Sequence, residues 1–148
     1  MTPRINIAKA QPAAYEALIG LEKYMQTTSL SNTEKELIKL RASQINHCAF
    51  CIDMHTTDAL KYGENPKRLF LLDAWRETNL YSEEEKIILQ LTEEITLIHQ
   101  HGVTEETYNK AKEILSEEKT AQVIMAIITI NAWNRLAIST EMGFGVKL

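Results

Sequence analysis

The stretch ELIKLRASQINHCAFCIDMH, residues 36–55, decides how the whole chain is interpreted. It holds both cysteines of the protein, Cys48 and Cys51, in a C-x-x-C pair, and His55 follows the pair after four residues. On a helix that turns by about 100° per residue, these three side chains fall within roughly 60° of one another. Two thiols and an imidazole therefore share one helix face, and the rest of the chain is interpreted as a scaffold for it.

A break in the helix is expected at Asn46–His47, directly before the cysteine pair. In one straight helix, Glu36 and Cys48 would lie about 18 Å apart along the axis. A break at Asn46 would let the helix before it fold back beside the next one, so that Glu36 approaches the cysteines. Glu36 also has a simpler interpretation, because Thr33 and Glu36 have the spacing of a capping box, as do Ser31 and Glu34.

Helical spacing of apolar residues and helix start and stop signals predict about six to seven helices and no convincing strand. We expect an extended lead-in over residues 1–11 and a first helix at 12–27. A second helix runs from the capping boxes at 31–36 through residue 45. Further helices are expected at 48–62, 66–72, 83–101, 104–115 and 116–138. The cysteine pair would begin the third of these helices. The last helix is apolar on nearly every side around its centre, which is typical of a core or interface helix. The prediction is one all-α domain over residues 1–148.

Composition excludes several classes of function. The 148 residues carry a net charge of -4 without a clustered basic face, so no nucleic-acid partner is expected. The first residues lack the apolar core of a signal peptide, and the longest apolar run is too short to span a bilayer. We therefore expect a cytoplasmic protein that does not bind membranes. In that compartment a C-x-x-C pair indicates redox chemistry or metal binding.

The pair has the features of a redox-active dithiol. The thiolate is the reactive form of cysteine, and a helix N-terminus lowers the pKa of a thiol. A peroxide would oxidise one thiolate to a sulfenic acid, and the second thiol would condense with it to a disulfide. His55 lies one helical turn after Cys51, within reach of its proton. A carboxylate beside His55 would orient the imidazole, and Glu36 is the candidate.

At these residues the chain resembles the alkylhydroperoxidase D-like (AhpD-like) proteins of the carboxymuconolactone decarboxylase superfamily. Their pattern is a Glu twelve residues before C-x-x-C and a His four residues after it, which matches Glu36, Cys48, Cys51 and His55. Three segments are also similar: SQINHCAFCIDMHT (43–56), WRETNLYSEEEKIILQLTEEIT (75–96) and INAWNRLAI (130–138). The resemblance covers residues 13–142, and the cysteine pair separates this chain from the decarboxylases.

The resemblance implies an all-α enzyme, assembled as a homo-oligomer (trimer or hexamer), that acts as a thiol peroxidase on alkyl hydroperoxides or as a disulfide reductase. It assigns the attack on the peroxide to Cys51, the resolving role to Cys48, and a proton relay to Glu36 and His55. It implies no bound cofactor and an external dithiol reductant, such as a lipoyl-bearing protein. His47 is a further candidate, which either tunes the thiols or caps the helix.

Other interpretations of the same residues stay open. The cysteines could be small buried hydrophobic residues. They could bind zinc together with His55 or His47, with a fourth ligand from a subunit interface. The dithiol could serve a redox sensor or metal-binding oligomeric module with little turnover. A lactone or decarboxylation activity of the superfamily would need neither thiol.

Overall fold

The computed structural model describes residues 4–142, which contain helices and no strand. The helices of this part are α1 (Ile7–Ala10), α2 (Pro12–Met25), α3 (Asn32–Ile45), α4 (Ala49–Lys61), α5 (Pro66–Phe70), the 3-10 helix η1 (Leu72–Glu77), α6 (Glu83–Thr96), α7 (Ile98–His101), α8 (Glu105–Leu115) and α9 (Glu117–Thr140). The all-α prediction is therefore confirmed. The longest helices, α2, α3, α4, α6, α8 and α9, all belong to the predicted set.

Two predicted segments differ from the structure. The lead-in is not extended throughout, because the Asn6 side chain accepts a hydrogen bond from the Lys9 backbone and caps the short α1. The predicted helix at 83–101 is broken at Leu97 into α6 and α7. This break follows from tertiary contacts, because Glu94 accepts a hydrogen bond from the Thr104 backbone and the chain turns back between these two residues.

Of the two capping boxes proposed for the start of α3, only one forms. Ser31 is the N-cap residue, and its side chain and that of Glu34 exchange hydrogen bonds with each other's backbone. Since the helix begins at Asn32, Thr33 and Glu36 lie inside it and cannot form a second box. The Glu36 side chain is therefore available for a partner on another helix.

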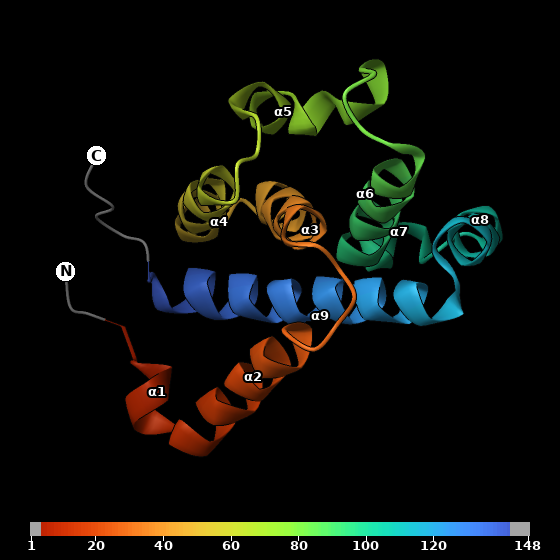
Figure 1. The fold of residues 1–148 in the computed structure, drawn as a ribbon. Helices are drawn as coiled ribbons and strands as arrows, with labels where there is room; N and C mark the ends of the chain where they lie inside the picture. The colour runs from red at the N-terminus through yellow and green to blue at the C-terminus, as the bar shows by residue number, and fades with distance from the viewer. Residues whose placement is uncertain (1–3, 143–148) are drawn as a thin grey trace.

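Helix α9 is the centre of the molecule (Figure 1). It lies between α2 on one side and α3, α4 and α6 on the other, and α8 packs near its beginning. The length of α9 and its mean hydropathy of 1.3 over an 18-residue window would also be compatible with a membrane-spanning helix. In this structure it is the helix against which five others pack, so it lies in the core, which is one of the two places predicted for it.

The turn between α3 and α4 is tied to α9. His47 adopts a left-handed backbone conformation with φ of 56°, and the Asn46 side chain donates hydrogen bonds to Asn131 and Asn134 of α9. Asn134, which is fully buried, also donates to the hydroxyl of Ser43 at 3.0 Å. The predicted break at Asn46–His47 is thus confirmed, and it places α3 and α4 side by side.

Candidate functional site

The cysteine pair lies at the N-terminus of α4, as predicted. Cys48 is the N-cap residue and Cys51 lies in the first turn, so both face the positive end of the helix dipole. The two sulfurs are joined in a disulfide, and both residues are buried, with 2% of their surface exposed. Ala137 of α9 and Phe50 pack against them. The structure therefore shows the oxidised form of the dithiol.

A cavity of about 350 Å³ opens beside this disulfide. Its wall contains Cys51 but not Cys48. The lining is mostly apolar, with polar groups on one part of the wall; it consists of Tyr15, Glu22, Lys39, Phe50, Cys51, Met54, His55, Asp58, Trp133, Ala137 and Met142. Cys51 is therefore the sulfur that a small molecule in the cavity would contact.

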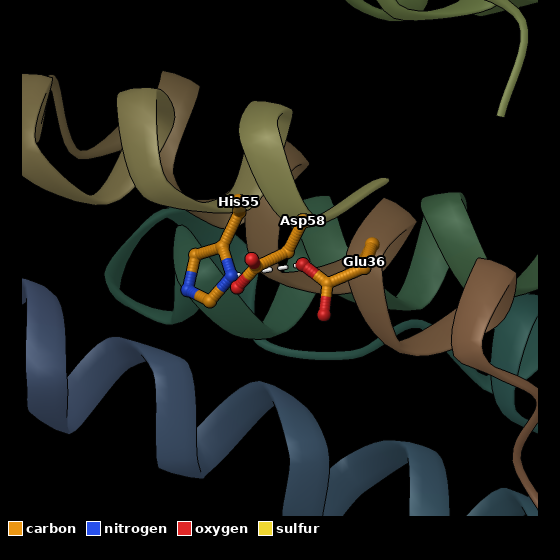
Figure 2. Close-up of side chains that lie close together, drawn as sticks. All are labelled: Glu36, His55 and Asp58. Atoms are coloured by element: carbon orange, nitrogen blue, oxygen red, sulfur yellow. Dashed lines mark hydrogen bonds and ion pairs between the residues drawn. The ribbon is translucent and has the colours of Figure 1, made fainter. Parts of the chain in front are cut away.

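His55 and Glu36 form a buried hydrogen-bonded pair between α4 and α3 (Figure 2). Nδ1 of His55 lies 2.9 Å from Oε2 of Glu36, and the residues are 5% and 6% exposed. Since a carboxylate only accepts hydrogen bonds, Nδ1 carries the hydrogen and Nε2 of the neutral ring has a free lone pair. Of the two predicted roles for Glu36, capping its own helix and contacting His55, the structure shows the contact with His55.

Asp58 belongs to the same cluster, although it was not singled out in the sequence. It lies one turn after His55 on α4, and ligand atoms of Glu36, His55 and Asp58 all lie within 4.8 Å of one another (Figure 2). The spacing of three residues from His55 places Asp58 on the helix face that carries the cysteines. That periodicity was the signal that could have identified it.

Two charged residues extend the polar part of the cavity wall. Nζ of Lys39 lies 3.5 Å from Glu22 of α2 and 4.0 Å from Oε1 of Glu36. Neither residue had a signal in the sequence, because the position of α2 relative to α3 and α4 depends on the contacts that these helices make with α9.

An aromatic pair forms another part of the wall. Tyr15 of α2 and Trp133 of α9 meet edge to face, with ring centroids 5.5 Å apart. The indole N–H of Trp133 is buried and has no hydrogen-bond partner among residues 4–142. It is a buried donor left unpaired in the described part of the chain.

His47 is placed differently from the other predicted residues. It is exposed in the turn before α4 and is not part of the cavity wall. The structure thus brings Cys51, His55 and Glu36 together, places Cys48 behind Cys51, and leaves His47 at the surface. A zinc site that uses both sulfurs would require the disulfide to be reduced first.

The chain is similar to known proteins over most of its length. The model of the carboxymuconolactone decarboxylase family matches residues 12–94, more than half of the chain. The uncharacterised protein YdfG of Bacillus subtilis (strain 168) is 43% identical over 139 residues, which cover 94% of this chain and 95% of that protein.

Solved structures are also similar. A crystal structure from Agrobacterium tumefaciens, of a protein of unknown function described as a candidate antioxidant defence protein AhpD, has a TM-score of 0.92 at 36% identity, and the match covers 99% of this chain and 100% of that one. An uncharacterised peroxidase-related protein from Silicibacter sp. TM1040 has a TM-score of 0.75 at 18% identity, over 85% of this chain and 67% of that one. The second similarity concerns the fold alone.

Proposed function

Since the chain belongs to the carboxymuconolactone decarboxylase family, as its resemblance to AhpD-like proteins predicted, we propose that it is a thiol-dependent peroxidase that reduces organic hydroperoxides. The family also includes decarboxylases, so the proposal depends on the site of this chain. One observation carries it: Cys51 of a disulfide-forming pair shares a cavity wall with His55, which is hydrogen-bonded to Glu36. A redox sulfur, a base and a group that orients the base thus occur at one small-molecule cavity.

The proposed reaction starts from the reduced dithiol. His55 takes the proton of Cys51 on Nε2, and the thiolate attacks one oxygen of the peroxide bond. The O–O bond breaks, the alkoxide leaves as an alcohol with a proton from His55, and Cys51 becomes a sulfenic acid. The Cys48 thiol then attacks the Cys51 sulfur, and its proton goes to the leaving hydroxide, which releases water and forms the disulfide. One hydroperoxide and two thiols give one alcohol, one water and one disulfide.

The burial of the two sulfurs limits which reductants can reach the disulfide. With 2% of each cysteine exposed, a flat protein surface cannot reach the disulfide. A dithiol on a long flexible arm can enter the cavity and attack Cys51, and a lipoyl group is such a dithiol. We therefore propose an external lipoyl-type reductant and no bound cofactor.

Peroxide consumption by the reduced protein tests the proposal, with free thiols counted before and after and with reduced lipoamide as the recycling dithiol. The wild type should lose two thiols per chain in the first turnover and then turn over repeatedly. Cys51→Ser should be inactive. Cys48→Ser should react once and then stop, because the sulfenic acid has no resolving thiol. Full steady-state activity in Cys51→Ser would refute the assignment.

The same dithiol also suits a second function, a redox sensor, because both sulfurs lie close enough to form a disulfide within one helix turn. A sensor would react once with peroxide and would not be recycled by lipoamide. The peroxide assay separates the two functions by the number of turnovers per chain.

A further inference from the structure

We propose that Glu36, His55 and Asp58 form a binding site for a divalent transition-metal ion, with Zn²⁺ as the ion to test. The three residues offer one imidazole nitrogen and two carboxylate oxygens within 4.8 Å of one another. Zinc binds imidazole and carboxylate ligands at about 2.0–2.2 Å, usually with four ligands. Three protein ligands would leave one position for water, and His55 and Asp58 both line the cavity that would supply it.

The backbone holds these ligands in a suitable arrangement. His55 and Asp58 are one turn apart on α4, and Glu36 faces them from α3, so the ligands come from two helices packed against each other. Glu36 and His55 are already in contact at 2.9 Å. Asp58 is less buried than the other two residues, so its side chain has the most freedom to move toward a bound ion.

The charges around the cluster favour a cation. Glu36 is buried, with 6% of its surface exposed. Its Oε1 has no hydrogen bond among residues 4–142. The nearest cation to this oxygen in that range is Lys39, whose Nζ lies 4.0 Å away. Within the part of the chain that the structure describes, Asp58 pairs only with Lys61, whose side chain is 67% exposed. The cluster thus carries two carboxylates whose paired lysines lie 4.0 Å away or are exposed, and a dication would be attracted to it.

Binding would interfere with the proposed proton relay. A metal on Nδ1 of His55 replaces the hydrogen that Nδ1 shares with Glu36, and a metal on Nε2 occupies the lone pair that accepts the Cys51 proton. In either case the ion removes the base from the reaction. This consequence rests on the proposed function, whereas the binding itself does not.

Zinc binding to the oxidised protein tests the site without interference from thiols, because both sulfurs are then in the disulfide. Isothermal titration calorimetry with ZnCl₂ should give one ion per chain. Asp58→Asn should weaken binding by about tenfold or more, since it loses a ligand. Asp53→Asn, an exposed carboxylate on the same helix, is the matched control and should bind as the wild type does. Absence of saturable binding, or equal affinity in Asp58→Asn, would overturn the proposal.

A second measurement on the wild type does not depend on the folding of a variant. Imidazole ¹⁵N NMR signals of His55 should shift when ZnCl₂ is added to the oxidised protein, while those of the exposed His99 and His101 should not. Unshifted His55 signals would contradict the site.

In the peroxide assay, ZnCl₂ should inhibit the wild type more than Asp58→Asn, each relative to its own metal-free rate. Zinc binding without any peroxide consumption would refute the proposed function but would still support the metal site.

Discussion

At the scale of single residues, the hydrogen bond between His55 and Glu36 determines which imidazole nitrogen can act. Glu36 is buried and its Oε2 accepts from Nδ1, so the base of the site is Nε2. In the proposed reaction, the same bond keeps a negative charge beside the ring, which would stabilise the imidazolium that forms when Cys51 loses its proton. Under that proposal, Glu36 is a positioning residue that acts through His55.

Replacing Glu36 with Gln should therefore slow the reaction of reduced Cys51 with iodoacetamide at neutral pH by about tenfold to a hundredfold. The amide can still occupy the space but does not stabilise the imidazolium, so the pH profile of alkylation should move to higher pH. Glu34→Gln removes a charge from the same helix without touching His55 and should leave the profile unchanged. An unchanged profile in Glu36→Gln would exclude the relay.

At the scale of helices, polar pairs add to the apolar contacts that hold several elements in place. Almost all of α3 between Glu34 and Ser43 is buried, although its sequence is rich in charge. Arg41 contacts Glu93 of α6 at 2.9 Å and also Asp73 of η1. Glu34 pairs with Lys119 of α9 at 2.7 Å. Since removal of one partner leaves a buried charge uncompensated, these pairs specify which helices pack on α3.

Glu94 of α6 is the corresponding link to α8. It accepts hydrogen bonds from Gln90 at 2.6 Å, from the Thr107 hydroxyl at 2.7 Å and from the Thr104 backbone at 2.9 Å. Burial alone would raise the pKa of the Glu94 carboxyl, but these hydrogen bonds outweigh it and hold the pKa below its ordinary value of 4.5. The ionised form therefore stabilises the fold above that pH, and this stabilisation is lost as the pH falls through the lowered pKa.

Glu94→Gln should lower the free energy of unfolding at pH 7 by about 1–3 kcal/mol, because hydrogen bonds to a charged group are weakened. The difference from the wild type should shrink in acid, where the wild-type carboxyl is protonated too. Urea unfolding followed by circular dichroism at pH 7, 4 and 3 measures both effects. Glu105→Gln, an exposed carboxylate in the first turn of α8, is the control. A difference that stays constant down to pH 3 would show that the charge of Glu94 does not matter.

At the scale of the whole molecule, α9 organises the fold but is not fully covered by it. Ile128 and Ile138 of α9 are each 45% exposed, although the helix packs against five others. On α4, Leu60 is exposed to the same extent. Where such side chains form a contiguous apolar patch, that patch marks a contact with another protein surface.

We propose that the protein is a homo-oligomer, a trimer or a hexamer, and that Ile128 contributes to the contact. Sedimentation equilibrium should give three or six times the chain mass of 16.9 kDa. Ile128→Asp should shift the protein toward the monomer, because burial of a carboxylate in an apolar contact is unfavourable. Glu113→Lys, a charge change on the exposed face of α8, should not. A monomeric wild type at micromolar concentrations would refute the proposal.

The sequence by itself determined the helical class, most helix ends and the face that carries Cys48, Cys51 and His55. These features depend on local physics: helix periodicity, the caps at Ser31, Ser82 and Thr104, and the spacing of the motif. The break at Asn46–His47 was also predicted from local sequence, and only three residues, 46–48, separate α3 from α4.

Only the tertiary structure decided which partners these residues have. Whether Glu36 caps its helix or contacts His55 depends on how α3 packs against α4, and local sequence allows both. The break at Leu97, the cavity wall from α2 and α9, and the membership of Asp58 in the cluster depend on contacts between distant segments. Such contacts follow from the shape and charge of the packed helices, and a local pattern of residues does not contain them.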